Sequence, residues 1–279
     1  MAGILYVVAT PIGNLEDVTL RALRILREVT LIAAEDTRRT AKLLQHYSIS
    51  TRTTSLHEHN EREKTRRLVE RLQAGESIAL VSDAGTPVIS DPGQGLIAAA
   101  RTAGVRVESI PGPSAVLAAI AASGLEAEEF VFLGFPPTRS KDRSLWLARL
   151  AAEDRLVAFF EAPHRIRQTL GELSERIGED RIVAVARELT KTHEELVIQP
   201  IKTLLTGLKE ARGEFTILVP PGHAREPVEA QPLDVGALRI ELGLITETQA
   251  LSGRDALKVL ASRHGVGVNE LYRLLKGDA

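Results

Sequence analysis

Short apolar segments alternate with amphipathic segments along the first half of the chain. The segment 4–9 is almost wholly apolar, as expected of a strand buried on both faces, and Leu20, Leu23 and Leu26 recur at helical spacing. Strands are therefore expected at 4–9, 31–34, 77–81 and 105–110. Helices are expected at 19–29, 37–47, 60–75, 95–103 and 115–122. The alternation predicts an α/β fold built on a mostly parallel sheet.

The same alternation restarts after a small polar segment at 124–129. Strands are expected at 130–134, 156–160, 181–186, 194–198 and 215–219, and helices at 144–152, 163–177 and 204–211. A polar, Pro-rich segment follows, and the tail at 238–275 has amphipathic spacing that outlines a helix–turn–helix. The expected organisation is an N-terminal α/β domain (1–123), a C-terminal α/β domain (124–221), a linker (222–233) and a helical extension (234–279).

Two local motifs lead to specific expectations. Asn60 and Glu63 have the spacing of a capping box, in which the side chain of Asn60 accepts the amide of Glu63 and Glu63 reaches back. The segment 93–98 matches the glycine pattern of dinucleotide-binding loops, but the preceding strand ends near Val81, about a dozen residues earlier. We therefore interpret that match as coincidence.

The composition narrows the class of protein. The 279 residues include 35 basic and 37 acidic ones, a net charge of −2, with 44% hydrophobic and 26% charged residues, as in soluble globular proteins. The absence of Cys excludes disulfides, thiolate metal sites and cysteine nucleophiles. No apolar run is long enough to span a bilayer, and no basic signal-peptide region precedes the first strand, so a cytoplasmic location is expected.

Positive charge is concentrated in one segment. Between Arg38 and Arg71 there are nine Lys or Arg against four acidic residues, a local charge of +5. This surface could bind a polyanion such as RNA, or it could be a solvated helix face with Glu–Arg pairs, and both interpretations remain open. If it binds RNA, the candidate contacts are Arg38, Arg39, Arg62, Arg66 and Arg67.

Four loops follow strands in the first half, at 10–14, 35–38, 82–93 and 111–114. Because the carboxyl ends of parallel strands meet at one edge of the sheet, these loops are expected to gather where α/β proteins bind ligands. Their Pro and Gly residues allow close approach to a ligand by backbone N–H groups. A metal is not predicted, because His57 and His59 have no evident third ligand.

These motifs together resemble the tetrapyrrole-methylase-fold methyltransferases, and within them the 2′-O-ribose methyltransferases of ribosomal RNA. The resemblance runs from about residue 3 to residue 220, and the helical tail also fits. The most specific segments are 9–17, 35–38, 57–60, 82–93, 161–165 and 187–191. One departure is Pro136, where the family pattern has Leu, and it affects the expected geometry near 134–137.

The resemblance implies a two-domain fold of the class III S-adenosylmethionine methyltransferases, with the cofactor between the domains, no metal, and usually a homodimer. On the methionine and ribose side the implied residues are Pro11, Asp83, Ala84, Gly85, Thr86, Val88, Ser114 and Ala115. On the adenine side they are Ala162, Pro163, Arg187, Glu188, Gly213, Glu214, Phe215 and Thr216. The implied product is S-adenosylhomocysteine.

The implied reaction transfers a methyl group to the ribose 2′-hydroxyl of a decoding-region cytidine of 16S rRNA in the small ribosomal subunit. In-line alignment of the hydroxyl oxygen with the sulfonium methyl supplies much of the acceleration. Either a base removes the hydroxyl proton, or that proton leaves late in the transition state. The candidates for this step are Asp36, Glu161 and Lys191, and the sequence does not rank them. The alternatives are a methylase of a tetrapyrrole or another small molecule, and a non-catalytic RNA-binding factor on the same fold.

Overall fold

The computed structural model describes residues 2–207 and 213–222, together with tail residues 236, 238, 241–243, 245–246, 253–264, 268, 271–272 and 275. The chain divides into two compact units, Met1–Gly222 and His223–Ala279. Across the described parts, no helix has the length and apolarity that crossing a membrane requires.

The first sheet of the larger unit is entirely parallel, in the order β3-β2-β4-β1-β5. Its strands are β1 (Ile4–Val8), β2 (Leu31–Ala34), β3 (Thr53–Ser55), β4 (Ile78–Val81) and β5 (Arg106–Ile110). The four predicted strands are confirmed. The strand β3 was not predicted, because its three residues are polar and part-exposed and lack an apolar pattern.

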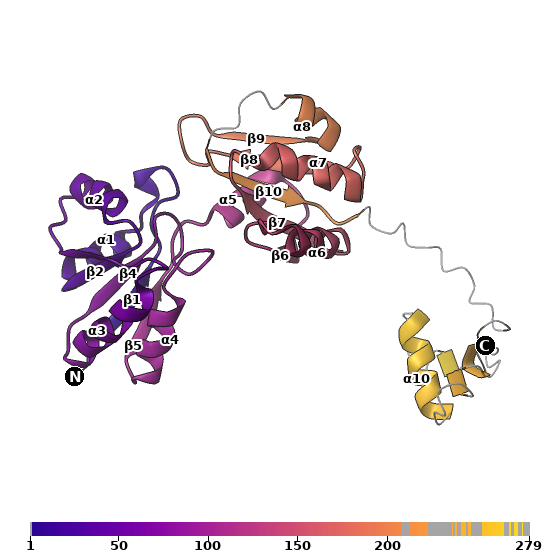
Figure 1. Cartoon of the computed structure of the whole chain (residues 1–279), viewed down its shortest axis with the longest axis horizontal. Coiled ribbons are helices and arrows are strands. Elements are labelled where there is room, and N and C mark those ends of the chain that lie inside the picture. The colour runs from indigo at the N-terminus through magenta and orange to yellow at the C-terminus, as the bar shows by residue number, and fades with distance from the viewer. Residues whose placement is uncertain are drawn as a thin grey trace. The chain divides into compact units, whose positions relative to one another are not determined.

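Helices cover both faces of this sheet (Figure 1). These elements are the short 3₁₀ helix η1 (Leu15–Asp17) and α1 (Leu20–Glu28), α2 (Thr37–His46), α3 (Glu61–Gln73) and α4 (Gln94–Thr102). One apolar cluster joins α1 and α2 to one face, and a second joins α3 and α4 to the other face. β2 and β4 are buried along their whole length, which explains their continuous apolar sequence.

The capping box expected at the start of α3 is wrong. The side chain of Asn60 makes no cap hydrogen bond to the helix; its Oδ1 accepts the amide of His57 at 3.0 Å. Glu63 instead pairs with Arg67 at 3.2 Å. The reason is local: the amide of Asn60 donates to the carbonyl of His57 and closes a tight turn, so the Asn60 side chain faces that turn.

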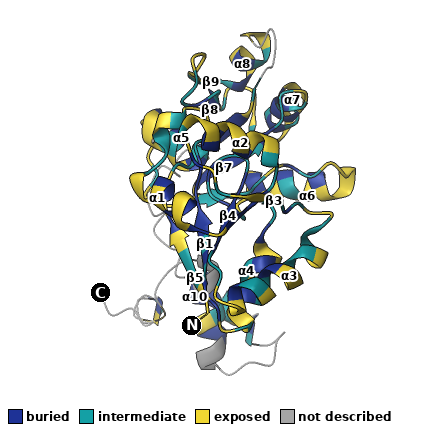
Figure 2. Ribbon diagram, turned by 90° about the vertical axis from the view of Figure 1, so that its left-hand side faces the viewer, coloured by how far each residue is buried: buried dark blue, intermediate teal, exposed yellow. Residues whose placement is uncertain are grey.

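The second sheet is mixed, in the order β6-β7-β10-β8-β9. Its strands are β6 (Phe130–Phe132), β7 (Leu156–Glu161), β8 (Ile182–Arg187), β9 (Glu195–Pro200) and β10 (Phe215–Val219), all at predicted positions. Only the β6–β7 pair is parallel. One face is covered by α6 (Ser140–Ala151), α7 (Ile166–Ile177) and α8 (Ile201–Gly207). Figure 2 shows the strands largely in the colour of buried residues and the outer helix faces in that of exposed residues.

The helix α5 (Ala115–Ser123) covers the other face of the second sheet. It begins directly after the loop that follows β5, yet its Val116 and Ala119 pack in a cluster with Ala158, Ala184 and Leu218. Although α5 falls within the expected first domain, it therefore packs with the second sheet, and it brings the carboxyl edge of the first sheet next to the second.

In the smaller unit, α10 (Gly253–His264) is helical, in agreement with the predicted tail. Ala256 and Leu260 form an apolar cluster with Leu238, Ile245 and Leu271. Residues 223–233 of the predicted linker and the predicted break at 265–267 lie outside the described residues.

Candidate active site

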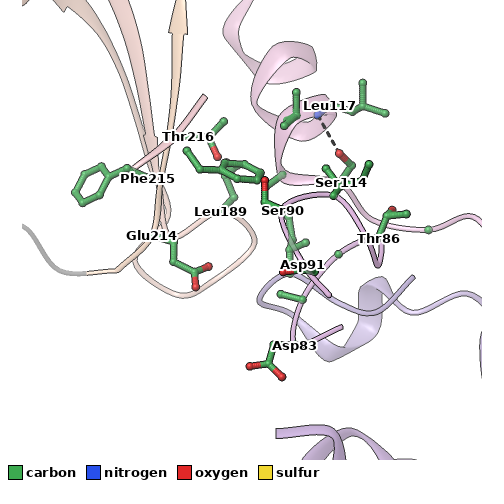
Figure 3. A pocket seen from close by; sticks show the side chains of 18 of the residues that line it. Asp83, Thr86, Ser90, Asp91, Ser114, Leu117, Leu189, Glu214, Phe215 and Thr216 are labelled. Atoms are coloured by element: carbon green, nitrogen blue, oxygen red, sulfur yellow. Dashed lines mark hydrogen bonds between the residues drawn. The ribbon is translucent and has the colours of Figure 1, made fainter. Parts of the chain in front are cut away.

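A cavity of about 520 Å³ lies where the loops of the first sheet meet the second sheet. The loops after β1, β2, β4 and β5 contribute to one side, and residues around β7, β8 and β10 contribute to the other. The predicted residues that line it are Asp83, Ala84, Gly85, Thr86, Ser114, Ala115, Glu161, Glu188, Lys191, Glu214, Phe215, Thr216 and Arg39. Figure 3 shows Glu214, Phe215 and Thr216 opposite Thr86, Asp91 and Ser114.

Other predicted residues do not line the cavity wall. These are Pro11, Val88, Ala162, Pro163, Arg187, Gly213 and Asp36. Each lies within two residues of a lining residue along the chain, so the predicted loops reach the cavity while these side chains do not line it. The loops expected at the ligand-binding edge also line the cavity with Ile12, Glu35, Ile89, Ser90, Asp91, Pro111 and Gly112. The lining residues outside those four loops that were not individually predicted are Ser109, Val116, Leu117, Phe135, Phe160 and Leu189.

Two loops at the cavity are tied together by backbone hydrogen bonds. The amide of Thr10 donates to the carbonyl of Gly85 at 2.8 Å, and the amide of Gly85 donates back to Thr10 at 3.0 Å. Gly85 has φ +74°, a value that favours glycine. The backbone of Gly85 is therefore used within the protein, and this residue shapes the cavity through its conformation.

Backbone strain is concentrated in two loops of the cavity. Val88 and Ser90 have φ of 77° and 67°, and Glu188 and Thr190 have φ of 51° and 66°. In the described part of the chain, only Ser48 joins them as a non-glycine residue with positive φ. Such conformations persist where surrounding contacts impose them, and they cluster at functional sites.

Carboxylates dominate the charge of the cavity. Burial raises the pKa of Asp91 to about 6, with help from the negative charges of Glu35, Asp83 and Glu214, while a hydrogen bond with Ser82 opposes the shift. Burial also raises the pKa of Glu35, whose Oε2 accepts the amide of Asp83 at 3.3 Å. This wall therefore favours a ligand that carries positive charge.

Asp36 lies outside this group of carboxylates. Its Oδ1 caps α2 by accepting the amide of Arg38 at 2.8 Å, and its Oδ2 pairs with the Arg38 guanidinium at 2.8 Å. Hydrogen bonds from the side chain and amide of Arg38 lower the pKa of Asp36 to about 2. A carboxylate with so low a pKa is a weak proton acceptor, and it does not face the cavity.

Glu161 is buried and fully engaged. Its carboxylate accepts the amide of Ala162 at 2.9 Å and the Thr169 hydroxyl, and it pairs with Arg165 at 3.3 Å and with Arg143 at 4.0 Å. These partners compensate its charge, so Glu161 is best suited to anchoring the loop that follows β7.

Lys191 also has a fixed partner. Its Nζ donates to Glu188 Oε1 at 2.7 Å, and both side chains line the cavity. The loop that carries them contacts the loop after β1, since the Thr190 hydroxyl accepts the amide of Asn14 at 2.9 Å.

The candidate RNA contacts differ in their positions. Arg39 lines the cavity and pairs with Asp83 at 3.3 Å, whereas Arg38 is exposed at the start of α2. On α3, Arg66 pairs with Glu70 at 3.6 Å and Arg67 pairs with Glu63 at 3.2 Å, while Arg62 is exposed. Exposed pairs of this kind contribute little stability, so these arginines could exchange their partners for phosphates at small cost.

The glycine motif at 93–98 forms the start of α4, and its amides are occupied. The amides of Gly95 and Leu96 donate to Glu61 Oε1 at 2.8 and 3.3 Å. This arrangement agrees with the interpretation of the motif as coincidence. Within the described ranges, no group of three or more His, Cys, Asp or Glu could hold a metal ion.

Comparisons with known proteins show the family to which this chain belongs. The family model of tetrapyrrole (corrin/porphyrin) methylases matches residues 4–205. The solved structure of uroporphyrin-III C-methyltransferase from Thermus thermophilus, complexed with S-adenosylhomocysteine, covers 78% of this chain and 97% of its own, with a TM-score of 0.57 and 20% identity. The chain belongs to the tetrapyrrole methylase family and is a methyltransferase, as the motifs indicated.

Two curated relatives are similar over almost the whole chain. The ribosomal RNA small subunit methyltransferase I of Vibrio cholerae serotype O1 is 46% identical over 98% of this chain and 94% of its own. The protein of the same name from Escherichia coli O157:H7 is 45% identical over 97% of this chain and 94% of its own.

Proposed function

We propose that this chain methylates a ribose 2′-hydroxyl of 16S rRNA, with S-adenosylmethionine as the methyl donor. The acceptor is the decoding-region cytidine, numbered 1402 by convention. The observation that supports this most strongly is the pairing of a strained, carboxylate-lined cavity with extended identity to rRNA methyltransferases.

The cavity fits S-adenosylmethionine in volume and in chemistry. A volume of about 520 Å³ lies within the range of small-molecule sites. The carboxylates of Glu35, Asp83, Asp91 and Glu214 complement a sulfonium and an ammonium group. Ile12, Phe160 and Leu189 supply apolar wall for an uncharged ring.

Different residues of the cavity are proposed to bind different parts of the cofactor. Asp83, Thr86 and Ser114 are proposed to hold the methionine and ribose parts, and Glu214–Thr216 the adenine side. When bound, the cofactor supplies an electrophilic methyl group. The fixed loops align the acceptor with that group, and this alignment lowers the barrier without a metal.

The basic segment is proposed to hold the RNA backbone. Arg39 extends from the cavity wall, Arg38 lies beside it on α2, and Arg62, Arg66 and Arg67 lie on α3. RNA phosphates bound along this surface would place a ribose at the mouth of the cavity. The carboxylates of the cavity repel phosphate, so a ribose hydroxyl rather than a phosphate would lie next to the methyl group. We also propose that the larger unit consists of two α/β domains, at 1–123 and 124–221. The protein is further proposed to form a homodimer and to act in the cytoplasm.

The test is methyl transfer from labelled S-adenosylmethionine to undermethylated small subunits, compared with free 16S rRNA and with a tetrapyrrole precursor. We expect incorporation into the subunit and one newly protected step in an alkaline ladder, since a 2′-O-methyl removes the nucleophile for cleavage. A methylated base with normal cleavage would refute ribose as the acceptor. Labelling of the tetrapyrrole alone would refute RNA as the substrate.

A further inference from the structure

The loop after β6, at 134–137, brings an exposed aromatic ring to the cavity. Phe135 lines the cavity and keeps 47% of its surface exposed. Its ring centroid lies 5.5 Å from that of Phe160, with the two rings tilted at 54°. Val116 and Leu189 line the same cavity but are buried. Phe135 therefore has free ring surface at the open side of the cavity.

Two more exposed apolar side chains line the cavity. Ile89 of the loop after β4 is 51% exposed, and Leu117 of α5 is 57% exposed. A Cβ on Gly134 would lie 3.6 Å from Ser90 Oγ, so the loop that carries Phe135 abuts the loop that carries Ile89. Ile89, Leu117 and Phe135 form what we term the apolar mouth of the cavity. Exposed apolar residues that gather at one place mark a binding surface.

The backbone on both sides of Phe135 is fixed. Before it, the carbonyl of Gly134 accepts the amide of Phe160 at 2.9 Å. After it, the carbonyl of Pro136 accepts a hydrogen bond from the guanidinium of Arg165. The ring of Pro136 also restricts the backbone of the residue that precedes it. A side chain held in this way can stack on a ligand with little loss of conformational entropy.

A buried charge network behind the loop holds it in place. Arg165 pairs with Glu161 at 3.3 Å, and Arg143 lies 4.0 Å from the same carboxylate. Arg143 also donates to the carbonyl of Pro137 at 3.3 Å. Because a satisfied buried network rigidifies the groups that it joins, the loop presents Phe135 as a fixed platform.

We propose that Phe135 binds the RNA substrate by stacking its ring on the base of the nucleotide whose ribose is methylated, an inference that rests on the proposed function. A nucleobase is planar and uncharged, and proteins that recognise unpaired RNA bases stack them on aromatic side chains such as Phe. The apolar mouth offers such a ring, and Ile89 and Leu117 offer apolar contacts beside it.

The charges of the cavity leave the apolar mouth to the base. The carboxylates of the wall complement the positive charges of the cofactor, and Arg39 complements a phosphate. Neither charge favours a neutral base. The base and the 2′-hydroxyl are carried by adjacent carbons of the ribose, so a base stacked on Phe135 would also keep that hydroxyl close to the cavity.

The experiment measures steady-state methyl transfer to undermethylated small subunits at saturating S-adenosylmethionine, with F135A, F135L and F135Y. F135A should raise KM for the subunit about 5–150-fold, the range that stacking of one base contributes. Its kcat should stay within about twofold, because stacking stabilises the bound substrate and the transition state alike.

The other two variants separate stacking from packing. F135Y keeps an aromatic face and should have a KM close to that of wild type, whereas F135L fills similar space without that face and should recover little. A role in packing alone would be met by Leu. If F135A fails to fold in a thermal melt, the comparison of F135Y with F135L decides between the two roles.

The matched control is F130A, because Phe130 of β6 is also exposed and does not line the cavity. Its KM should equal that of wild type. Calorimetry with S-adenosylmethionine and sedimentation velocity are run on each variant, and F135A should leave cofactor affinity and oligomeric state unchanged.

Four results would overturn the inference. They are a wild-type KM for F135A, a wild-type KM for F135L, a loss of cofactor affinity in F135A as large as its rise in KM, and a change of oligomeric state in F135A. The third would place the cofactor's adenine on this ring, and the fourth a second copy of the chain. Failure of the proposed function would look different, because wild type itself would then not label the subunit.

Discussion

Gly13 lies so close to the backbone of Leu189 that a Cβ on Gly13 would be 2.7 Å from the Leu189 carbonyl oxygen. The same Cβ would be 2.6 Å from Lys191 Cγ and 2.7 Å from Thr190 Oγ1. The loop after β1 and the loop after β8 therefore meet with no space for a side chain. Because a carbonyl oxygen cannot rotate away, the two loops would have to separate.

We expect Gly13→Ala to weaken binding of S-adenosylmethionine by at least about tenfold, roughly 1.4 kcal/mol, measured by calorimetry. The matched control is Gly171→Ala in α7, where a Cβ meets nothing within 4 Å. That variant should bind normally and be slightly more stable, since Ala favours helix over Gly. Normal binding by Gly13→Ala would show that the contact between the loops does not shape the cavity.

The raised pKa of Asp91 predicts a pH-dependent cost in stability. A pKa of about 6 in the folded state, against 3.8 ordinarily, means that the folded protein holds this proton more tightly. Stability therefore falls as pH rises from about 4 to 6, and it stays lower above that range. Asp91→Asn removes this cost, by about 1–2 kcal/mol after allowance for solvent screening.

Thermal melts should show directly that the ionised carboxylate of Asp91 lowers the stability of the folded protein. Asp91→Asn should melt about 2–6 °C above wild type at pH 8, and the difference should shrink at pH 4.5. An equal difference at both pH values would indicate an effect unrelated to ionisation. Higher stability with lower activity is expected where a site keeps a buried charge for function.

The buried network around Glu161 should be the most sensitive to truncation. Arg143 donates to Glu172 at 2.7 Å and to Thr169 at 2.7 Å, and its side chain is only 8% exposed. Arg143→Ala removes one of two cations beside a buried carboxylate, so we expect about 3–5 kcal/mol of destabilisation in denaturant melts. Exposed Arg149 on the same helix is the control, and Arg149→Ala should change stability by less than about 0.5 kcal/mol.

The basic surface of α3 can be tested by its salt dependence. Arg66→Glu combined with Arg67→Glu should weaken binding to the small subunit and make its dependence on salt shallower, with cofactor affinity unchanged. The control with the same change in net charge is Arg24→Glu combined with Arg149→Glu, at two exposed positions. If both double variants show the wild-type dependence of binding on salt concentration, α3 is a solvated helix face that does not contact RNA.

The sequence predicted the elements and the loops of the site better than its individual side chains. Apolar runs such as those of β2 and β4 are recognisable because each strand is buried on both faces. Asp36 and Asp91 both lie in loops that follow strands, and only the hydrogen bond to the amide of Arg38 turns Asp36 into a helix cap. The pKa of Asp91 is raised first by burial in the cavity and then by the charges of Glu35, Asp83 and Glu214. Glu35 and Glu214 are far away in sequence, so no local pattern could reveal this shift.

The strand order of the first sheet has a consequence for synthesis of the chain. β1 pairs only with β4 and β5, so the first strand made has no partner until residues near Ile78 have left the ribosome. At 5–20 residues per second, that wait is about 4–14 s, during which an apolar segment is exposed on the nascent chain. The cavity itself needs Glu214–Thr216, so it forms only after nearly the whole larger unit has been translated. A ribosome stalled before β10 would therefore carry a folded first sheet without a cofactor site.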